Sequence, residues 1–309
     1  MRRRSLYIGL LGSLLVGWGV ASCDRSPKHR TTIAVVPKVD DASVSAAKAA
    51  ALAARDRYGI AVRWDVSRAQ TAESQAELIE KLVAAGVDGI LLSCIDAEAE
   101  VLREAIDAAV NKGVKVGTFD SDAPRSGRSF YIGSDNPAAG RLAAETLREL
   151  CAEGERGATG IGVFGGVEGD AAMRERLGAF VAEVPDTAAT FWTDGDGAAA
   201  EGRMQVTDFL TREAQRPVNG VVFLSSTAVV DGPGAIGRLD SLCREAAGAA
   251  VFFDWSEPIA GFVAEMPHCA AIRQDFGAMV EGGVDRLVRI IEGEPVGETV
   301  IYTPVEVVR

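Results

Sequence analysis

The sequence predicts an α/β protein built from two doubly wound, parallel-sheet lobes. Short apolar runs alternate with amphipathic helical segments almost without interruption from Thr32 onward, and the same alternation is repeated in the second half of the chain. Such alternation is typical of parallel sheets that are covered by helices on both faces. A length of 309 residues suits two lobes better than one.

The first half opens with a β-branched run, followed by an alanine-rich helix that ends at Gly59. A second helix carries Leu78, Leu82 and Val83 on one face and ends at Gly86, a residue type that commonly follows helix C-termini. The expected strands cover residues 32–37, 60–66, 89–94, 114–120 and 130–134, and the expected helices cover 43–58, 71–85, 97–111 and 137–151.

The second half repeats this scheme with strands of similar length. The expected strands cover residues 160–165, 188–193, 221–225, 249–255 and 270–274, and the expected helices cover 171–183, 199–211, 235–246, 258–264 and 277–291.

The first 23 residues have the order of a bacterial lipoprotein leader. Arginines at positions 2–4 precede an apolar run from Leu6 to Val20, and the small residues Ala21 and Ser22 precede Cys23. We expect residues 1–22 to be a signal peptide, Cys23 to carry lipid, and residues 23–31 to be a flexible tether to the membrane. The alternative is an uncleaved anchor helix, although the apolar run is short for a membrane span. Both interpretations place the rest of the chain in the cell envelope, at the outer face of the inner membrane or in the periplasm.

The charge balance argues against a nucleic-acid partner. The formal net charge is −12, and no basic cluster follows the N-terminal arginines. An acidic surface repels phosphate backbones. We expect a monomer that binds a small molecule and no nucleic acid.

The cysteines and histidines do not predict a metal site. Cys94 closes an apolar run and is expected in the core, and neither His29 nor His268 lies in a cluster of ligands. Cys243 and Cys269 flank consecutive structural units and can form a disulfide, which the sequence alone leaves open. No metal and no cofactor are expected.

No motif predicts a catalytic site. Residues 160–165 fit a dinucleotide-binding glycine pattern, but they form a strand instead of following one. Residues 194–197 begin like a calcium loop, which then continues with alanines. We therefore expect a protein that is not an enzyme and has no catalytic residues. A glycoside hydrolase that uses Asp120 and Asp254 is the remaining enzymatic alternative.

Short polar side chains follow nearly every predicted strand, at the sheet edge where α/β proteins bind ligands. Carboxylates and amides at such an edge suit a polyhydroxyl ligand, because each carboxylate accepts several hydroxyl hydrogen bonds. Asp96, Asp170 and Ser134 are expected only to cap helices, whereas Asp120 and Asp254 each end a strongly apolar strand. The strand-end residues include Lys38, Asp40, Asp41, Asp120, Ser121, Asp122, Ser134, Asp135, Asn136, Asp194, Asp196, Ser225, Ser226, Asp254, Gln274 and Asp275.

Six short motifs occur in an order that resembles the type 1 periplasmic sugar-binding proteins of the ribose and galactose group, which share their fold with lac-repressor-type effector domains. The resemblance runs from Thr32 to Arg309, and a lipoprotein leader in place of a DNA-binding segment points to the transport branch. The motifs are Gly-Val-Asp-Gly-Ile at 86–90, Thr-Phe-Asp-Ser-Asp at 118–122, Ile-Gly-Ser-Asp-Asn at 132–136, Met-Arg-Glu-Arg at 173–176, Phe-Phe-Asp at 252–254 and Ala-Ile-Arg-Gln-Asp at 271–275.

The resemblance implies two lobes joined by three crossovers, expected near residues 135–136, 274–275 and 295–297. The N-terminal lobe would comprise 32–135 with 275–296, and the C-terminal lobe 136–274 with 297–309. The resemblance also assigns ligand contacts to both lobes, with Arg174 as a planar fork in the second lobe. The alternative for Arg174 is a surface arginine paired with Glu168 or Asp170. The predicted ligand-binding residues are Asp40, Asp41, Asp120, Ser121, Arg174, Ser226, Asp254 and Gln274.

The chain departs from this family where aromatic rings usually stack on the sugar. Residues 40–44 read Asp-Asp-Ala-Ser-Val, and Ser226-Thr227 stands in place of Asn-Asp. Of the two tryptophans that can substitute, we place Trp255 in the cleft and Trp192 in the core. The departures point away from a standard ribose or galactose ligand.

The resemblance implies a lipid-anchored solute-binding protein of a sugar-type ABC transporter. It would bind a monosaccharide or polyol by hinge closure and deliver it to the permease in the membrane. The alternative is a sensory receptor of the same fold.

Overall fold

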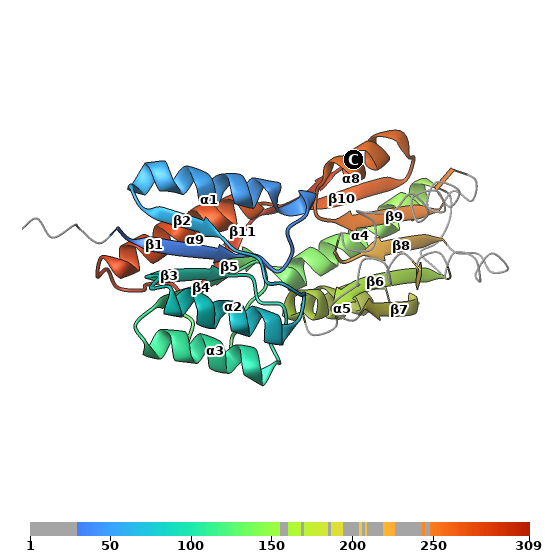
Figure 1. Cartoon of the computed structure of the whole chain (residues 1–309). Helices are drawn as coiled ribbons and strands as arrows, with labels where there is room; N and C mark the ends of the chain where they lie inside the picture. Colours follow the sequence, from blue (N-terminus) through green and yellow to red (C-terminus); the bar gives the residue numbers. More distant parts are fainter. Residues whose placement is uncertain are drawn as a thin grey trace, which may run out of the picture. The chain divides into compact units, whose positions relative to one another are not determined.

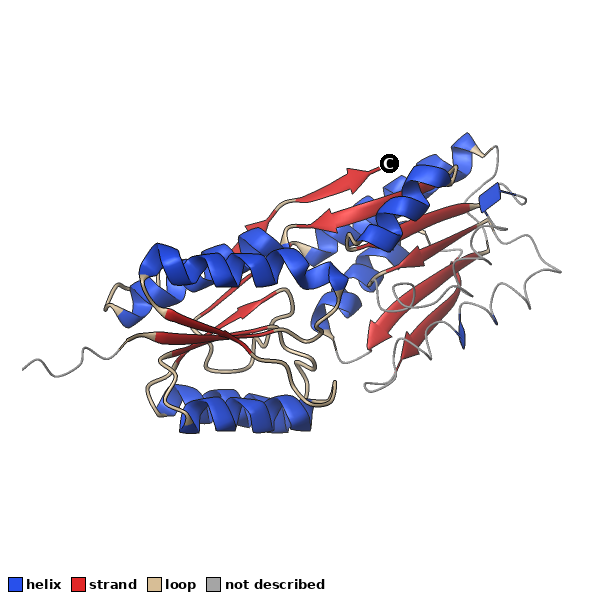
Figure 2. Ribbon diagram, turned by 45° about the horizontal axis from the view of Figure 1, so that its top comes forward, coloured by secondary structure: helices blue, strands red, loops and turns tan. Residues whose placement is uncertain are grey.

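In the computed structural model, the chain forms two six-stranded sheets, each flanked by helices (Figures 1 and 2). Both sheets belong to one compact unit, Thr31–Arg309. The structure describes residues 30–154, 160–167, 170–184, 187–193, 204–205, 208, 219–225, 243–244 and 248–309. The signal peptide, Cys23 and nearly all of the tether predicted from the sequence therefore lie outside the described residues.

The first sheet is parallel throughout. Its strands are, in spatial order, β11 (Val300–Thr303), β5 (Phe130–Ser134), β4 (Lys115–Phe119), β3 (Gly89–Leu92), β1 (Thr32–Val36) and β2 (Ala61–Trp64). The accompanying helices are η1 (Ala42–Val44), α1 (Ser45–Tyr58), α2 (Ala72–Ala84), α3 (Glu100–Asn111) and α9 (Phe276–Ile291).

Alternating side chains of the buried strands fill cores on the two faces of this sheet, as the period of two in a β-strand requires. Ile33 and Val35 of β1 pack into the core that α1 and α9 cover, whereas Ala34 and Val36 pack into the core beneath α2 and α3. The strand is apolar throughout because both of its faces are buried.

The second sheet is parallel except for its edge strand β12, which runs antiparallel to β10. Its strands are, in spatial order, β12 (Val305–Val308), β10 (Cys269–Gln274), β9 (Ala249–Phe253), β8 (Gly220–Phe223), β6 (Ile161–Val167) and β7 (Thr187–Thr193). The described helices of this half are α4 (Asn136–Glu153), α5 (Ala171–Glu183) and α8 (Glu257–Glu265).

The chain passes between the two halves at three points. It leaves β5 for α4, which packs on the second sheet, and it leaves β10 for α9, which packs on the first. Asp135 and Asp275 cap these helices by accepting hydrogen bonds from the N–H groups of Ala138 and Ala278. The third passage lies at Pro304, between β11 and β12.

This third passage corrects the sequence prediction. The crossover expected at residues 295–297 lies instead at Pro304, because β11 pairs with β5 in the first sheet. Neither β11 nor β12 was predicted, and residues 297–303 had been assigned to the other lobe. The remaining described strands and helices correspond to predicted elements, whereas most of the helices expected at 199–211 and 235–246 falls outside the described residues.

One glycine allows α4 and α5 to pack closely. A Cβ atom on Gly140 of α4 would lie 2.3 Å from the main-chain oxygen of Arg176 in α5, a separation that no real Cβ contact reaches. A residue with a side chain at position 140 would therefore push α5 and the Arg176 side chain out of place.

Candidate ligand-binding site

Two aspartates occupy equivalent backbone positions at the ends of β4 and β9. Asp120 and Asp254 have φ angles of 58° and 69°, in the left-handed region that aspartate tolerates better than most residues. Each donates its main-chain N–H over 3.1 Å to the strand beside it, to the carbonyl oxygens of Ile132 and Ile272 respectively. This shared turn places one buried carboxylate at the edge of each sheet.

The first half-site, which we define as Lys38, Ser93, Asp120 and Ser121, centres on a buried ion pair. The Lys38 Nζ atom lies 3.0 Å from Oδ2 of Asp120, and the Ser93 hydroxyl donates to the same oxygen over 2.7 Å. Burial favours the neutral amine, but the carboxylates of Asp120 and Asp170 outweigh it and raise the pKa of Lys38 above its ordinary value. Lys38 therefore remains charged inside the protein.

Asp170 links the two halves of the chain. It caps α5 by accepting from the N–H of Ala172, and it also lies 2.6 Å from Nζ of Lys38. The Ser121 hydroxyl donates to Asp170 over 2.9 Å and accepts from Lys38 over 2.7 Å. Burial opposes ionisation of Asp170, yet the charge and hydrogen bond of Lys38 hold the pKa of this carboxyl below its ordinary value.

The second half-site, which we define as Arg176, Asp254 and Gln274, centres on a fully buried arginine. Arg176 has no exposed surface, and its guanidinium carbon lies 4.5 Å from the ring centre of Phe253. Its nitrogens donate to Oδ1 of Asn136 at 2.9 Å, the carbonyl oxygen of Leu224 at 2.8 Å and Oε1 of Gln274 at 2.6 Å. The Arg176 guanidinium is thus held in place by acceptors from three separate segments of the chain.

Gln274 connects this arginine to the carboxylate of its own half-site. Its Nε2 donates to Oδ1 of Asp254 over 2.6 Å, and its Oε1 accepts from Ser134 over 2.8 Å as well as from Arg176. Burial raises the pKa of Asp254, and the charge of Asp120 adds to the rise. The Ser134–Gln274 hydrogen bond joins the end of β5 to the end of β10, which are the first two points where the chain passes between its halves.

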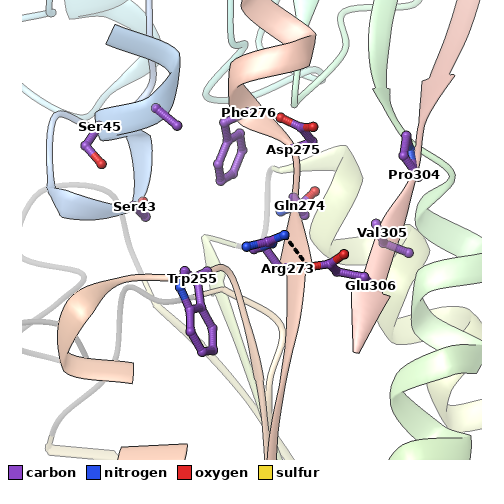
Figure 3. A pocket seen from close by; sticks show the side chains of 11 residues that line it. Ser43, Ser45, Trp255, Arg273, Gln274, Asp275, Phe276, Pro304, Val305 and Glu306 are labelled. Carbon is purple, nitrogen blue, oxygen red and sulfur yellow. Dashed lines mark ion pairs between the residues drawn. The ribbon is translucent and has the colours of Figure 1, made fainter. Parts of the chain in front are cut away.

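A cavity of about 400 Å³ adjoins Gln274 (Figure 3). Trp255, from the segment after β9, lies on one side, and Ser43 and Phe276 lie on the other. Arg273 projects into the space between them and is paired with Glu306 of β12. The cavity therefore offers an aromatic ring, an ion pair and a buried amide.

The structure brings together four of the eight ligand-binding residues predicted from the sequence. Asp120, Ser121, Asp254 and Gln274 all lie in the buried polar cluster. Ser226 lies outside the described residues.

The two acidic residues after β1 do not join this cluster. Asp40 pairs with Lys48 at 3.3 Å and accepts from the indole N–H of Trp64 at 3.1 Å, on the surface. Asp41 caps the short helix η1 by accepting from the N–H and hydroxyl groups of Ser43. Their hydrogen-bonding capacity is used locally, so the prediction for these residues is not supported.

Arg174 also lies apart from the cluster. Its side chain is 41% exposed and pairs with Glu98 at 3.1 Å. Of the two partners considered from the sequence, Asp170 pairs with Lys38 and Glu168 lies outside the described residues. The buried residues of α5 are Ala172, Met173, Arg176 and Phe180, which are spaced as one helical face. Arg174 is off this face, whereas Arg176, two positions later, lies on it and donates to Gln274 in the cluster.

Of the three residues expected only to cap helices, Asp170 caps one, whereas Ser134 and Asp96 do not. Asp170 is a cap, as expected, but it is also the link to Lys38. Ser134 instead donates to Gln274, while Asp135 caps α4. Asp96 accepts from the N–H of Glu98 in a loop, and α3 begins later, after Ala99.

Sequence reasoning missed Lys38, Asp170 and Arg176 as site residues. Helical spacing was sufficient to find Arg176, because it lies three residues after Met173 and four before Phe180. The strand-end rule had included Lys38, but no local pattern selected it from the other strand-end residues, since its partners are 82 and 132 positions away. Within the described part of the chain, no group of three potential metal ligands occurs. The same residues include no helix long and apolar enough to cross a membrane.

Paired α/β halves with buried polar groups contributed from both define a binding protein of the periplasmic type. The chain belongs to the periplasmic binding protein domain family, whose model matches residues 33–295. The predicted family resemblance and fold class are thereby confirmed.

Solved structures of sugar-binding proteins share this fold. An ABC transporter solute binding protein from Burkholderia graminis, solved in complex with D-arabinose, is 28% identical, with a TM-score of 0.77 over 90% of this chain and 94% of that one. GanP, a glucose-galactose binding protein from Geobacillus stearothermophilus, is 23% identical, with a TM-score of 0.75 over 91% of this chain and 98% of that one.

A curated relative matches over a shorter stretch. The ribose import binding protein RbsB of Bacillus subtilis is 30% identical over 106 residues, or 34% of this chain. The match spans 33% of the length of that relative.

Proposed function

We propose that the protein is a lipid-anchored receptor of the cell envelope that binds a monosaccharide or polyol and delivers it to an ABC permease. The observation that carries this proposal is the buried polar cluster, to which both halves of the chain contribute hydrogen-bonding groups. Family membership and the sugar ligands named for similar structures support the same class of ligand.

The charges in the cluster favour a neutral ligand with several hydroxyl groups. Lys38 is already matched by Asp120 and Asp170, and Arg176 is held by neutral acceptors near Asp254. A sugar hydroxyl both donates and accepts, so it can replace the direct bonds between Lys38, Ser121 and Asp170 without leaving a charge unpaired.

In the proposed mechanism the two halves are lobes that open and close about the three chain passages. We place the N-terminal lobe at 32–135 with 275–303, and the C-terminal lobe at 136–274 with 304–309. The ligand stabilises the closed form because it contacts Asp120 in one lobe and Asp254 and Arg176 in the other. Arg176 takes the role that the sequence had assigned to Arg174.

Trp255 provides an aromatic face that the segment after β1 lacks. Its ring lies on one side of the cavity beside Gln274, opposite Ser43 (Figure 3). We propose that the apolar face of the sugar ring packs on this indole. Trp255→Ala should then weaken sugar binding about tenfold, equivalent to the roughly 1.4 kcal/mol that an aromatic contact supplies.

Isothermal titration of the soluble domain, residues 24–309, against pentoses, hexoses, polyols and nucleosides tests the proposed ligand class. We expect saturable binding of at least one compound, lost in Arg176→Met and retained in Arg174→Met. Absence of binding by the whole panel to folded protein, as judged by circular dichroism, would contradict the proposal.

The anchor is tested separately from the ligand. The full-length protein should fractionate with membranes and carry lipid on Cys23, while Cys23→Ser should release it. Recovery of the wild-type protein free of lipid would contradict the anchor and leave the sugar-binding proposal standing.

A further inference from the structure

Two buried cysteine side chains in the second half of the chain are in contact. The Sγ atoms of Cys243 and Cys269 lie 3.3 Å apart, and the two residues are 1% and 4% exposed. Cys269 opens β10, and Cys243 lies shortly before β9 along the chain. Both belong to the apolar core that includes Phe164, Phe223 and Phe252.

We propose that Cys243 and Cys269 form a disulfide in the mature protein. An S–S bond is about 2.05 Å long, so the two sulfurs must approach by little more than 1 Å, which rotation about the Cα–Cβ bonds can supply. The bridge would fasten the start of β10 to the segment that leads into β9, across 26 positions of the chain. The two cysteines lie in an apolar cluster of described residues, whereas the proposed ligand-binding site is made of polar groups, so the two sites are distinct.

The location proposed above supplies the oxidant. Each thiol loses its proton, and the pair together passes two electrons to an oxidised protein disulfide of the envelope, which is reduced to a dithiol. One S–S bond forms in the receptor and one breaks in the donor, so atoms and electrons balance. The inference uses only the envelope location and is independent of the ligand.

The surroundings also set when the bond forms. The hydrogen bond with Cys243, together with burial, raises the pKa of the Cys269 thiol far above its ordinary value. The thiolate is the reactive form, so the folded and reduced protein would oxidise slowly. The bridge should therefore form during folding, before β10 is covered.

Two other cysteines serve as internal controls. Cys94 lies in the core of the first sheet, and the Sγ atom of Cys151 donates to the main-chain oxygen of Asn219 over 3.4 Å. Burial raises the pKa of Cys94 to about 12 and of Cys151 to about 11. We expect both to remain thiols.

Thiol counting on the Cys23→Ser protein exported to the envelope tests the inference. Unfolded in guanidinium without reductant, it should take up two maleimide labels, and after reduction all four of its cysteines should be labelled. Peptide mapping should recover a linked pair that contains Cys243 and Cys269. Four labels without reductant would overturn the inference.

A second measurement uses the wild-type protein, so it does not depend on whether variants of Cys243 or Cys269 fold. Reduction of the purified wild-type protein should lower its melting temperature by roughly 5–10 °C, and Cys243→Ser/Cys269→Ser should melt near the reduced value. The control Cys151→Ser should keep the response to reductant. An unchanged melting temperature after reduction would contradict the bridge, whatever the titrations with sugars show.

Discussion

Asp120 and Asp254 end equivalent strands in the two halves of the chain, with φ angles of 58° and 69°, yet their carboxylates have different partners. Asp120 is bound by the ammonium group of Lys38 and by Ser93, whereas Asp254 is bound by the amide of Gln274. A cation stabilises the charge of the first carboxylate, while burial raises the pKa of the second. The same backbone turn therefore presents two carboxylates with different electrostatic environments.

The largest expected effect comes from removing the cation of the second half-site. Arg176→Met removes the buried donor to Asn136 and Leu224 and leaves Oε1 of Gln274 with Ser134 alone, so the free energy of unfolding should fall by about 3–5 kcal/mol. Urea denaturation measures this loss. The matched control Arg174→Met removes an exposed ion pair and should cost less than about 1 kcal/mol. Equal losses in the two variants would contradict the placement of Arg176 in the core of the site.

A smaller effect should separate the two aspartates directly. Asparagine tolerates the same left-handed backbone, so Asp→Asn changes charge with little change in shape. Asp120→Asn should lower the free energy of unfolding by about 1.5–3 kcal/mol, because it removes the ion pair with Lys38 and the charge that strengthens the Ser93 hydrogen bond. Asp254→Asn should cost under about 1 kcal/mol, since its oxygen still accepts from Gln274. A larger loss of stability for Asp254→Asn than for Asp120→Asn would show that the ion pair with Lys38 does not stabilise the Asp120 carboxylate more than Gln274 stabilises that of Asp254.

The smallest effect is in the pH dependence of stability. The pKa of Asp170 is lowered in the folded protein, so its contribution is present above an unfolded value of about 3.9 and is lost as the pH falls through the folded value. The pKa of Asp254 is raised, so its contribution is present below about 3.9 and is lost as the pH rises through the folded value.

Because the two pKa shifts have opposite signs, the two Asp→Asn substitutions should change the pH dependence of stability in opposite ways. In urea denaturation between about pH 3 and pH 7, Asp170→Asn should flatten the loss of stability on the acid side. Asp254→Asn should instead remove a loss on the less acidic side of the same window. Parallel curves for both variants and the wild-type protein would contradict the two pKa directions.

The fold was predictable from sequence because it depends on periodicity. Apolar strands buried on both faces, such as β1 and β3, stand out as continuous runs. The strands β11 and β12 were missed because each is a four-residue edge strand with exposed positions, without a continuous buried run. Their assignment to different sheets depends on pairing with β5 and β10, which are distant in the chain.

The site was predictable only in part. Asp120, Ser121, Asp254 and Gln274 follow directly from strand ends, and the structure places them in the cluster. Lys38 was not selected because its role arises from contacts with residues far along the chain. Asp40 and Asp41 satisfy the same strand-end rule, yet they are bound to nearby side chains. Position in the sequence indicates the edge of the sheet but not the direction in which each side chain points.

In the proposed hinge mechanism, the 2.6 Å contact between Lys38 and Asp170 has a consequence for the apparent strength of ligand binding. An ion pair that favours the closed form lowers the fraction of open molecules, and in that mechanism only the open fraction is competent to bind. With one molecule in ten open, the apparent dissociation constant would be about tenfold above the intrinsic one. We therefore expect the Lys38–Asp170 contact to weaken the apparent affinity for every ligand by the same factor.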